Sequence, residues 1–435
     1  MRNIIGVSGR PRMGILLLTK NFPPVSCGVG DYTSRLAEEL VAGGSSVTVL
    51  TEPADDSRHL SFVLREVPLR GWHDLRPVLE AIVASSSDRV QLEYSAYAWN
   101  RWGAAWWVNA LVFQLRRRGI PVHVGLHELA IRMRQHPLQT PVALAQWLHI
   151  ALIVAAAKTV AVNMRSRAHL LERLFPWWSE KIRYRPNSTN IPVVPITEAE
   201  RRALRHVHGV APGEFVVATF GLFHPAKNYE GLIEAVALLR RSMPVQLWML
   251  GNIAAASLAY IARLKNAAHA AGIAQAVWWP GRLAAVEVSR ALQAADVFVL
   301  PQADGHLTRS GAFMAAAAHG LPVVAVRQPG GRDQAEFSHG INVWLVDYST
   351  AEEFAAAVRA LADDRAAAAR MGRNLRDLYA GRFDWRITAA GFHTTETTPS
   401  GGSDEAAVES DAAGNRPHAG RKCAAAAGPV SSGES

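Results

Sequence analysis

Residues 14–50 read GILLLTKNFPPVSCGVGDYTSRLAEELVAGGSSVTVL, and this stretch decides the fold. Two aliphatic runs, Gly14–Thr19 and Val47–Leu50, flank a loop rich in Pro and Gly and a segment with Tyr32, Leu36 and Leu40 at helical spacing. A strand, a helix and a second strand in this order form a βαβ unit, whose two strands run parallel. The stretch therefore predicts an α/β fold built on a parallel sheet.

The same alternation continues to about residue 192. Further aliphatic runs at Val90–Leu92, Val122–Leu126 and Val160–Val162 are separated by helical stretches. Continuous apolar runs of this kind are typical of strands that are covered on both faces of a sheet. A segment with several prolines and a charged helical patch follows at 193–213, and we interpret it as a linker.

A second alternating series begins at residue 214 and predicts a second doubly wound parallel sheet. The expected strands are Phe215–Phe220, Val245–Leu250, Val277–Trp279, Val297–Leu300 and Pro322–Val326, and the expected helices are Tyr229–Arg241, Leu258–Ala270, Val286–Ala294 and Gly311–His319. Open sheets of this class bind ligands at the carboxyl ends of their strands. We therefore expect the functional site in a cleft between two Rossmann-like domains.

The changes in pattern along the chain set the predicted domain boundaries. They give a basic extension at 1–12, a first Rossmann-like domain at 13–192, the linker at 193–213, a second Rossmann-like domain at 214–383, a short helical stretch at 384–393 and a tail at 394–435. The tail is rich in Ser, Gly, Ala and Thr and has no periodicity, so we expect it to be disordered.

The composition is that of a folded protein with more than one domain. The chain has 435 residues, of which 49% are hydrophobic and 19% are charged. Its net charge of +9 suits an anionic partner, such as a nucleic acid, a membrane surface or a phosphorylated substrate, and it equally fits a solvated surface rich in arginine.

The cysteines and the apolar runs predict a cytoplasmic protein. Cys27 and Cys423 are the two cysteines of the sequence, and they imply no disulfide framework and a reducing compartment. The first twelve residues lack the apolar segment of a secretory signal. The longest apolar run, Trp147–Ala157, is too short to cross a bilayer, and we interpret it as a buried helix.

Four motifs in a fixed order carry a resemblance to a known family. They are Phe22-Pro23-Pro24 with Gly28-Val29-Gly30-Asp31-Tyr32-Thr33, Gly221 to Lys227 with Leu232-Ile233-Glu234-Ala235, Ala295-Asp296-Val297-Phe298-Val299-Leu300-Pro301, and Ala318-His319-Gly320-Leu321-Pro322-Val323-Val324-Ala325. Together they resemble the group 1 (family 4) retaining glycosyltransferases over about residues 13–385. The resemblance implies a GT-B fold, with an N-terminal acceptor domain and a C-terminal donor domain, and a nucleotide-diphosphate sugar as donor substrate, with no metal or other cofactor required.

The glycines between the first strand and the first helix form a candidate phosphate loop. Gly28 and Gly30 lack side chains, so backbone N–H groups at the positive end of the helix can approach an anion. The resemblance places this loop near the donor phosphates and the acceptor. An ordinary strand-to-helix turn explains the glycines as well, and Asp31 fits either an acceptor contact or a charge at the helix start.

His127 and Glu128 follow the predicted strand Val122–Leu126, at an end that should face the cleft. The resemblance implies that His127 contacts the donor sugar or the pyrophosphate, with Glu128 beside it. A structural histidine is the alternative. The pair does not begin a zinc-binding helix, because no histidine stands three residues beyond Glu128.

Lys227 is the principal catalytic candidate. It lies in the loop that starts at Gly221, where a compact cation could offset the charge that develops on the leaving diphosphate. A solvated loop lysine is the alternative. The family usually carries an arginine five residues earlier, whereas this chain has Leu222.

The segment before the helix at Gly311 departs from the common family pattern. Two glutamates are usual there, and the aligned positions are Leu307 and Ala315. Asp304, Gly305 and Arg309 fit a variant pattern in which Arg309 supplies a phosphate-binding cation, together with Ser310 and Gly311 at the helix start. A weakened donor site is the alternative.

Gly331 and Asp333 follow the last predicted strand and would line the same cleft. The resemblance implies that this loop approaches sugar hydroxyls, so Asp333 is a candidate hydrogen-bond acceptor. A plain turn explains the sequence equally well.

One aromatic and basic stretch lies outside these motifs. It contains Trp99, Trp102, Trp106, Trp107 and the run 116–118 of three arginines. The tryptophan spacing favours a helix that packs into the core, and contact with anionic lipid or a lipid-linked acceptor is the alternative. No nucleic-acid module accompanies it, so we expect no nucleic-acid partner.

The sequence predicts a cytoplasmic glycosyltransferase that acts on a carbohydrate or lipid-linked acceptor, with the inner face of an anionic membrane as a candidate peripheral contact. The competing hypothesis is a GT-B-shaped binding or scaffold protein that has lost catalysis, because Leu222, Leu307 and Ala315 replace charged residues of the family pattern.

Overall fold

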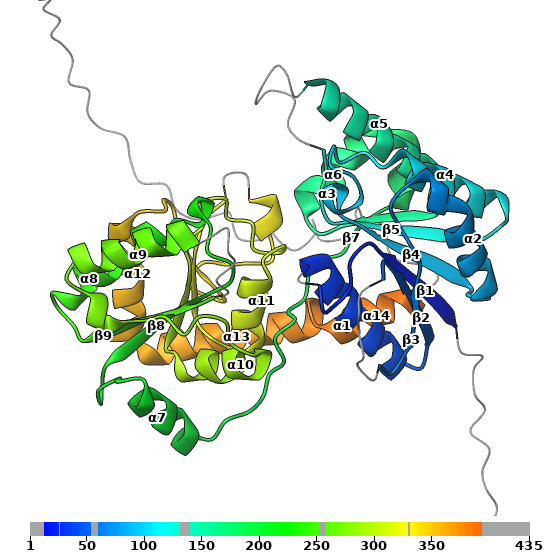
Figure 1. The fold of residues 1–435 in the computed structure, drawn as a ribbon. Helices are drawn as coiled ribbons and strands as arrows, with labels where there is room; N and C mark the ends of the chain where they lie inside the picture. Colours follow the sequence, from blue (N-terminus) through cyan, green and yellow to red (C-terminus); the bar gives the residue numbers. More distant parts are fainter. Residues whose placement is uncertain are drawn as a thin grey trace, which may run out of the picture. The chain divides into compact units, whose positions relative to one another are not determined.

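In the computed structural model, the described residues form two β-sheets of parallel strands, each packed with helices (Figure 1). The structure describes residues 13–25, 27–53, 60–130, 140–251, 258–328 and 331–393. The predicted basic extension and tail, the second cysteine and Gly330 lie outside the described residues. The predicted α/β class with two Rossmann-like sheets is confirmed.

The first sheet contains seven of the described strands in the order β3-β2-β1-β4-β5-β6-β7, and all their pairings are parallel. The strands are β1 (Gly14–Thr19), β2 (Ser46–Thr51), β3 (Val63–Glu66), β4 (Arg89–Tyr94), β5 (Val122–Leu126), β6 (Thr159–Val162) and β7 (Ile182–Tyr184). The helices among them are α1 (Gly28–Ala42), α2 (Leu75–Ala84), α3 (Ala96–Trp99), α4 (Trp106–Arg117), α5 (Thr140–Ala156) and α6 (Arg165–Leu174).

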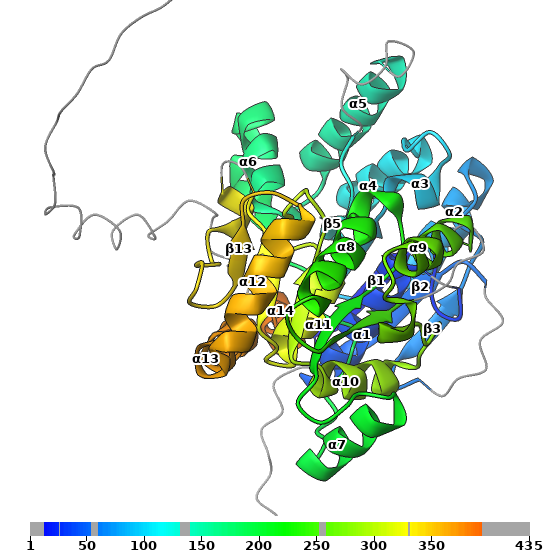
Figure 2. The ribbon, with the colours of Figure 1, turned by 90° about the vertical axis from the view of Figure 1, so that its left-hand side faces the viewer.

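The second sheet contains six described strands in the order β10-β9-β8-β11-β12-β13, again all parallel. The strands are β8 (Phe215–Phe220), β9 (Val245–Leu250), β10 (Val277–Trp278), β11 (Val297–Leu300), β12 (Val323–Val326) and β13 (Trp344–Val346). The helices are α7 (Glu198–Val207), α8 (Tyr229–Arg240), α9 (Leu258–Ala270), α10 (Ala285–Ala294), α11 (Gly311–Ala318), α12 (Ala351–Asp363) and α13 (Arg365–Arg382). Figure 2 shows α8 and α12 side by side.

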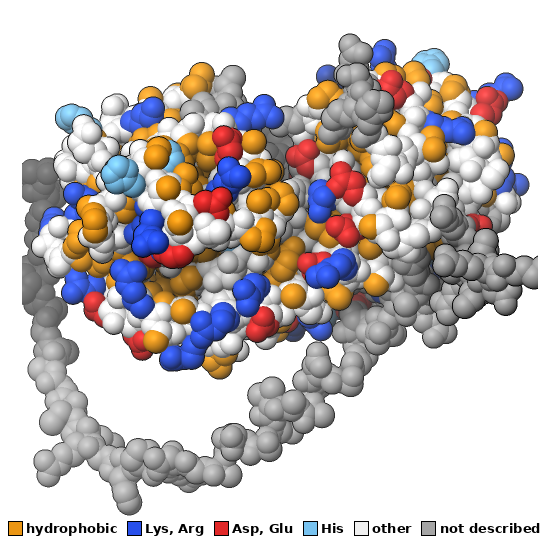
Figure 3. Space-filling model, turned by 90° about the horizontal axis from the view of Figure 1, so that it is seen from below, with side chains coloured by type: hydrophobic (Ala, Val, Ile, Leu, Met, Phe, Trp, Pro, Cys, Tyr) orange, Lys and Arg blue, Asp and Glu red, His pale blue; other side chains and the backbone are white. Residues whose placement is uncertain are grey.

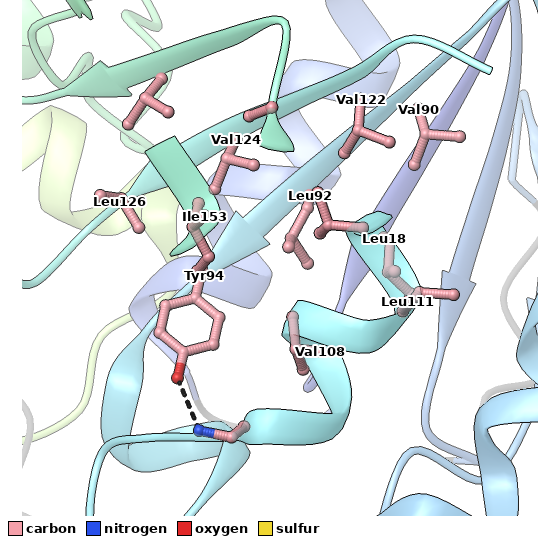
Figure 4. Close-up of a cluster of buried hydrophobic side chains, with 14 of the residues drawn as sticks. Leu18, Val90, Leu92, Tyr94, Val108, Leu111, Val122, Val124, Leu126 and Ile153 are labelled. Atoms are coloured by element: carbon pink, nitrogen blue, oxygen red, sulfur yellow. Dashed lines mark hydrogen bonds between the residues drawn. The ribbon is translucent and has the colours of Figure 1, made fainter. Parts of the chain in front are cut away.

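The core of the first sheet is formed by aliphatic side chains that leave less than one tenth of their surface exposed. Figure 4 shows Leu92 and Val124 of neighbouring strands packed with Val108 of α4 and Ile153 of α5. The Tyr94 ring lies in the same cluster, and its hydroxyl accepts a hydrogen bond from the Ala105 backbone N–H at 3.4 Å. Strands buried on both faces explain why the sequence shows continuous apolar runs.

The last described helix, α14 (Trp385–His393), packs against α1 of the first sheet although it follows α13 of the second. Its Trp385, Ala389 and Phe392 complete a cluster with Tyr32 and Leu36 of α1. The Trp385 indole Nε1 donates to the Thr189 carbonyl at 2.6 Å. The predicted helical stretch after residue 383 is therefore part of the core of the first sheet.

Three strands were not expected from the sequence: β3, β7 and β13. They have three or four residues each, and β3 is largely exposed. Such short edge strands give no apolar run long enough to be distinguished from a loop.

The tryptophan stretch does not form the single core helix that its spacing favoured. α3 ends at Trp99, a turn follows, and α4 begins at Trp106. Trp99 and Trp107 are buried, whereas Trp102 and Trp106 are exposed. The break divides one apparent stripe between the core and the surface.

The prediction of a buried helix at Trp147–Ala157 is wrong in part. α5 buries Gln146, His149, Ile150 and Ile153 on its inner side, but three of its leucines are exposed. The helix is apolar all round, so the sequence alone could not tell which side faces the core. None of the helices in the described ranges is long and apolar enough to cross a membrane.

Candidate active site

The predicted site residues lie in segments that follow strands of the two parallel sheets. The loop after β1 leads to Gly28 and Gly30, and β5 leads directly to His127. In the second sheet, Gly221 follows β8, and the segment from Asp304 to Gly311 follows β11. Carboxyl ends of parallel strands share one edge of a sheet, which is where α/β proteins of this class bind ligands.

His127 is held by a buried carboxylate that sequence reasoning missed. Its Nε2 donates to Glu93 Oε2 at 2.7 Å, and Glu93, at the end of β4, is 1% exposed. Gly125 makes room for this carboxylate, because a Cβ there would lie 2.2 Å from Glu93 Oε2. The Tyr32 ring packs edge-on against the imidazole, with centroids 5.0 Å apart. The ring orientation of His127 is thus fixed from two sides.

Glu93 is also linked to two further polar side chains. Gln91 Nε2 donates to Glu93 Oε1 at 3.0 Å, and an Arg185 guanidinium nitrogen lies 3.7 Å from the same oxygen. These contacts give the buried side chain of Glu93 polar partners, without which its burial would be costly. Such a partner can orient a histidine without contacting the substrate.

Lys227, Asp304 and Arg309 interact electrostatically in the second sheet. Burial lowers the pKa of the Lys227 ammonium, the Asp304 carboxylate opposes that shift, and Arg309 adds to it. Arg309 Nη2 donates to Asp304 Oδ2 at 2.7 Å. Gly221 has φ +126°, and a Cβ there would lie 3.3 Å from Lys227 Nζ. The structure therefore brings together these four predicted residues.

Arg167 of α6 is a third cation at this place, and the sequence analysis did not single it out. Its Nη1 donates to the His127 carbonyl at 2.8 Å and to Asn163 Oδ1 at 3.0 Å. Burial lowers the pKa of its guanidinium, and the nearby positive charge of Arg309 lowers it further, while Glu128 and Asp333 raise it. Two like charges held close together favour binding of an anion between them.

The start of α11 presents its N-terminus beside Arg309. Ser310 is the N-cap residue, and its hydroxyl accepts a hydrogen bond from the Phe313 backbone N–H at 3.2 Å. Gly311 is the first helical residue, and a Cβ there would meet no atom within 4 Å. The helix dipole adds positive potential to that of Arg309.

The two glycines of the first loop have different surroundings. Gly28 starts α1 and a Cβ there would have open space around it, whereas a Cβ at Gly30 would lie 2.7 Å from the Asn21 carbonyl oxygen. Gly30 therefore allows α1 to pack against the preceding loop. Asp31 is exposed in the first turn of α1, where its charge suits the helix dipole.

Asp333 joins the two sheets, and Gly331 lies in the same loop. Gly331 has φ +59° and precedes a short 3-10 helix that contains Asp333. Asp333 is fully buried, and Oδ1 accepts from the Ser166 backbone N–H at 2.8 Å while Oδ2 accepts from the Ser166 hydroxyl at 2.5 Å. A sugar contact by Asp333 remains a prediction, and it would require these bonds to open.

Glu128 and His306 complete the polar surroundings. Glu128 accepts a hydrogen bond from the Ser95 hydroxyl at 3.1 Å. His306 Nδ1 accepts from Gln328 Nε2 at 3.0 Å and lies 3.6 Å from Asp333. Burial lowers the pKa of His306, which interacts with Asp304, Arg309, Asp333 and Arg167. His306 stood between two recognised motif residues, and no pattern marked it.

The three positions where the family pattern has charged residues differ in burial. Leu307 and Ala315 are completely buried within the apolar cluster beneath α11, whereas Leu222 is exposed. Carboxylates could not replace Leu307 and Ala315 without a large desolvation cost. Across the described ranges, no three His, Cys, Asp or Glu side chains are grouped as they would be around a metal ion.

Comparisons with known proteins show what this chain is similar to. Residues 214–364 match the family model described as "Glycosyl transferases group 1". A protein named D-inositol 3-phosphate glycosyltransferase from Arthrobacter sp. (strain FB24) is 28% identical over 383 residues, which is 83% of this chain and 88% of that protein. Its namesake from Segniliparus rotundus is 27% identical over 322 residues, 72% of this chain and 67% of the relative.

Two solved structures show the same two-sheet fold. The Anabaena protein HepE, solved with UDP and glucose, has 18% identity and a TM-score of 0.66, over 88% of this chain and 98% of that chain. A glycosyltransferase from Rickettsia africae has 14% identity and a TM-score of 0.69, over 88% of this chain and 97% of that chain. Identities this low show the shared fold.

Proposed function

We propose that the chain is a glycosyltransferase of group 1 and that it transfers a sugar from a nucleotide-diphosphate donor to a carbohydrate or lipid-linked acceptor with retention of the anomeric configuration. The observation that carries this proposal is the placement of three cations in segments that follow strands of the two sheets: Lys227 beside Gly221, Arg309 at the start of α11, and Arg167 against the His127 carbonyl. A diphosphate is the anion that such a group of charges suits.

In the proposed reaction, the bond between the anomeric carbon and the diphosphate oxygen breaks, the acceptor oxygen bonds to the same face of the sugar, and the proton of the acceptor hydroxyl passes to the departing diphosphate oxygen. The electron pair of the broken bond remains on the diphosphate, so negative charge grows there. Lys227 provides a compact charge and Arg309 a planar guanidinium for these oxygens. The phosphates are proposed to approach the backbone at Gly28 and Gly221, which have no side chains, and at the start of α11 with Ser310 and Gly311.

His127 is proposed to contact the sugar from the first sheet. Glu93 already engages Nε2, so Nδ1 is the ring nitrogen proposed to face the substrate. Asp31 and Glu128 are proposed to bind acceptor hydroxyls, with Asp304, Gly331 and Asp333 nearer the donor sugar.

The names of similar proteins define the first substrates to test. HepE was solved with UDP and glucose, so UDP-glucose is the first candidate donor. The curated relatives are named for D-inositol 3-phosphate, which is the first candidate acceptor of the carbohydrate class. We propose no metal requirement and no nucleic-acid partner, and we propose a cytoplasmic enzyme in peripheral contact with an anionic membrane.

The deciding experiment is a thermal-shift screen of the whole chain against UDP-, GDP- and ADP-sugars, followed by assay of donor hydrolysis with and without EDTA. A ligand at 100 times its Kd stabilises a protein by about 2.7 kcal/mol, which gives a measurable shift in Tm. We expect one nucleotide class to raise Tm and to be hydrolysed slowly, with no effect of EDTA. The absence of both a shift and hydrolysis with every donor would refute the proposal.

A binding or scaffold protein without catalysis is the second candidate, and the burial of Leu307 and Ala315 favours it. That function predicts a thermal shift with a nucleotide sugar but no hydrolysis or transfer. It also predicts that Lys227→Ala weakens donor binding, and that neither the wild-type protein nor the variant turns over a donor.

A further inference from the structure

The outer side of α5 is an apolar surface without a described covering. Leu144, Leu148 and Leu152 recur every four residues and are 55%, 56% and 44% exposed. Residues 140–157 contain no Asp, Glu, Lys or Arg. A helix that is apolar on every side is normally buried on every side, yet Figure 1 places α5 on the outside of its layer.

α4 extends this surface along one flank of α5. Asn109 Nδ2 donates to the His149 carbonyl at 2.9 Å, and Arg116 Nη1 donates to the Ala155 carbonyl at 2.6 Å. These two contacts show that α4 and α5 run in the same direction. Phe113 lies between Asn109 and Arg116 on α4 and is half exposed, and Trp106 packs edge-on against His149. We define the α4–α5 face as Trp106, Phe113, Leu144, Leu148 and Leu152.

One end of this face is strongly basic. Arg116 and Lys181 donate to the last carbonyls of α5, and Lys158 is exposed directly after the helix. Trp177, in the same short helix as Lys181, is largely exposed. Residues 95–171 contain nine Lys or Arg residues and a single acidic residue, Glu128. In contrast, the view in Figure 3 shows acidic and basic side chains interspersed.

We propose that the α4–α5 face docks onto an anionic phospholipid bilayer, with α5 lying in the plane of the interface. Exposed leucines and aromatic rings next to a basic cluster are the features of interfacial helices, and basic residues are attracted to anionic lipid headgroups. A second copy of the chain is the less suitable occupant, because a two-fold contact pairs the same patch of both copies, and residues 140–158 contain no acidic side chain that could pair with the basic cluster.

The direction of α5 connects this face to the candidate active site. In a parallel sheet, a helix that follows a strand starts at the strand's carboxyl end, where His127 and Glu128 lie after β5. Beyond the other end of α5, the backbone N–H of Lys158 donates to the Val122 carbonyl at the start of β5. A bilayer on the α4–α5 face would therefore extend to the edge at which the acceptor is expected.

This inference rests on the proposed peripheral contact with a membrane, but it does not depend on the donor chemistry. Vesicle binding and donor hydrolysis can therefore fail separately. The test is co-sedimentation of the full chain with vesicles of phosphatidylcholine alone and of phosphatidylcholine mixed with phosphatidylglycerol, at low and high salt.

We expect binding to the mixed vesicles that weakens as salt rises, and little binding to phosphatidylcholine. Leu144→Ser/Leu148→Ser should lower the partition coefficient at least tenfold, and Lys158→Glu should lower it about fivefold or more. The matched control is Leu258→Ser on α9, because Leu258 is 57% exposed and lies on the second sheet. All variants should keep the wild-type rate of donor hydrolysis.

Three results would overturn the proposal. The first is equal binding to both vesicle types, and the second is unchanged binding of the Leu144→Ser/Leu148→Ser protein. The third is a dimer in solution that this double substitution converts to a monomer, which would assign the face to a second copy.

Discussion

Arg167 is the residue that most changes the interpretation of the site. The chain has Leu222 where the family usually carries an arginine, and the variant pattern predicts that Arg309 supplies a phosphate-binding cation. In the structure the positive charge of Arg309, from the other sheet, lowers the pKa of the Arg167 guanidinium. That guanidinium donates a hydrogen bond to the His127 carbonyl. Compensation by two arginines, one from each sheet, is therefore the sharper hypothesis.

Loss of Lys227 should reduce catalysis more than it reduces folding. Lys227→Ala removes a charge that opposes the growing charge of the leaving diphosphate, so kcat should fall by about 10²–10³, and Lys227→Arg should recover part of it. The measurement is the steady-state rate with the donor found by the screen, together with Tm. A kcat within twofold of wild type would contradict the assigned role.

Arg167→Ala should raise the donor KM about tenfold or more, because a charge-assisted contact to the diphosphate is lost. The matched control is Arg173→Ala, which removes an exposed arginine from the last turn of the same helix, α6. If both variants change KM equally, the effect comes from general charge and not from this site.

Glu93 should act only through His127. Glu93→Gln leaves a side chain of the same size but weakens the hold on the imidazole, so kcat should fall about 10–100-fold, as for other partners of functional histidines. The double variant Glu93→Gln/His127→Ala should be no slower than His127→Ala alone. Multiplicative losses in the double variant would show that Glu93 has a separate role.

Motif spacing predicted some residues of the candidate site and could not predict others. Lys227, Asp304 and Arg309 belong to motifs with fixed spacing, and they do interact. Glu93, Arg167 and His306 come from segments without a motif, and their importance arises from contacts between residues far apart in the chain. Spacing along the sequence cannot reveal such contacts.

At the scale of single elements, α5 predicts how stability depends on pH. His149 is completely buried on its inner side, its Nδ1 hydrogen-bonds to Asn109 Oδ1, and burial lowers its pKa to about 4. Burial also lowers the pKa of His123 on β5 to about 3. In the unfolded chain both residues bind protons near pH 6.5.

The unfolded state therefore binds more protons than the folded state between these pH values. The free energy of unfolding should be highest above about pH 6.5 and should decline as the pH falls toward 4. The part of this decline that comes from His149 should be at most about 3 kcal/mol. Urea unfolding of wild type and His149→Leu at pH 7, 6, 5 and 4 measures this. We expect a shallower decline in the variant, and parallel curves would exclude His149 as a source.

Elements differed in how well the sequence predicted them. Long strands such as β1, β5 and β8 coincide with aliphatic runs, because burial on both faces imposes a continuous pattern. The edge strands β3, β7 and β13 were missed, since partial exposure and short length remove that pattern. The outward side of α5 was missed for the opposite reason, because it is as apolar as the inward side.

At the scale of the whole molecule, bonds between the two sheets hold the candidate site together. Ser166 donates twice to Asp333, and Arg165 Nη2 donates to Glu336 Oε1 at 2.7 Å. Asn187 adds a backbone bond to the Thr308 carbonyl at 3.1 Å. The site depends on residues from both sheets, so these contacts should influence substrate affinity.

Asp333→Ala removes both acceptors of Ser166 and should loosen this contact. We expect a larger radius of gyration by X-ray scattering in the absence of donor and a donor KM raised severalfold, because part of the binding free energy must then order the two sheets. Asp347→Ala, which breaks the exposed pair with Arg327, is the control. Unchanged scattering and KM would contradict this role.

The packing of α14 on α1 has a consequence for biosynthesis. Tyr32 and Leu36 are covered by Trp385, Ala389 and Phe392, which a ribosome adds about 350 residues later. At about 5–20 residues per second, that interval is tens of seconds. During this interval the nascent chain exposes an apolar surface on α1, so chaperones that bind emerging chains have a defined target there, and their release should coincide with the docking of α14.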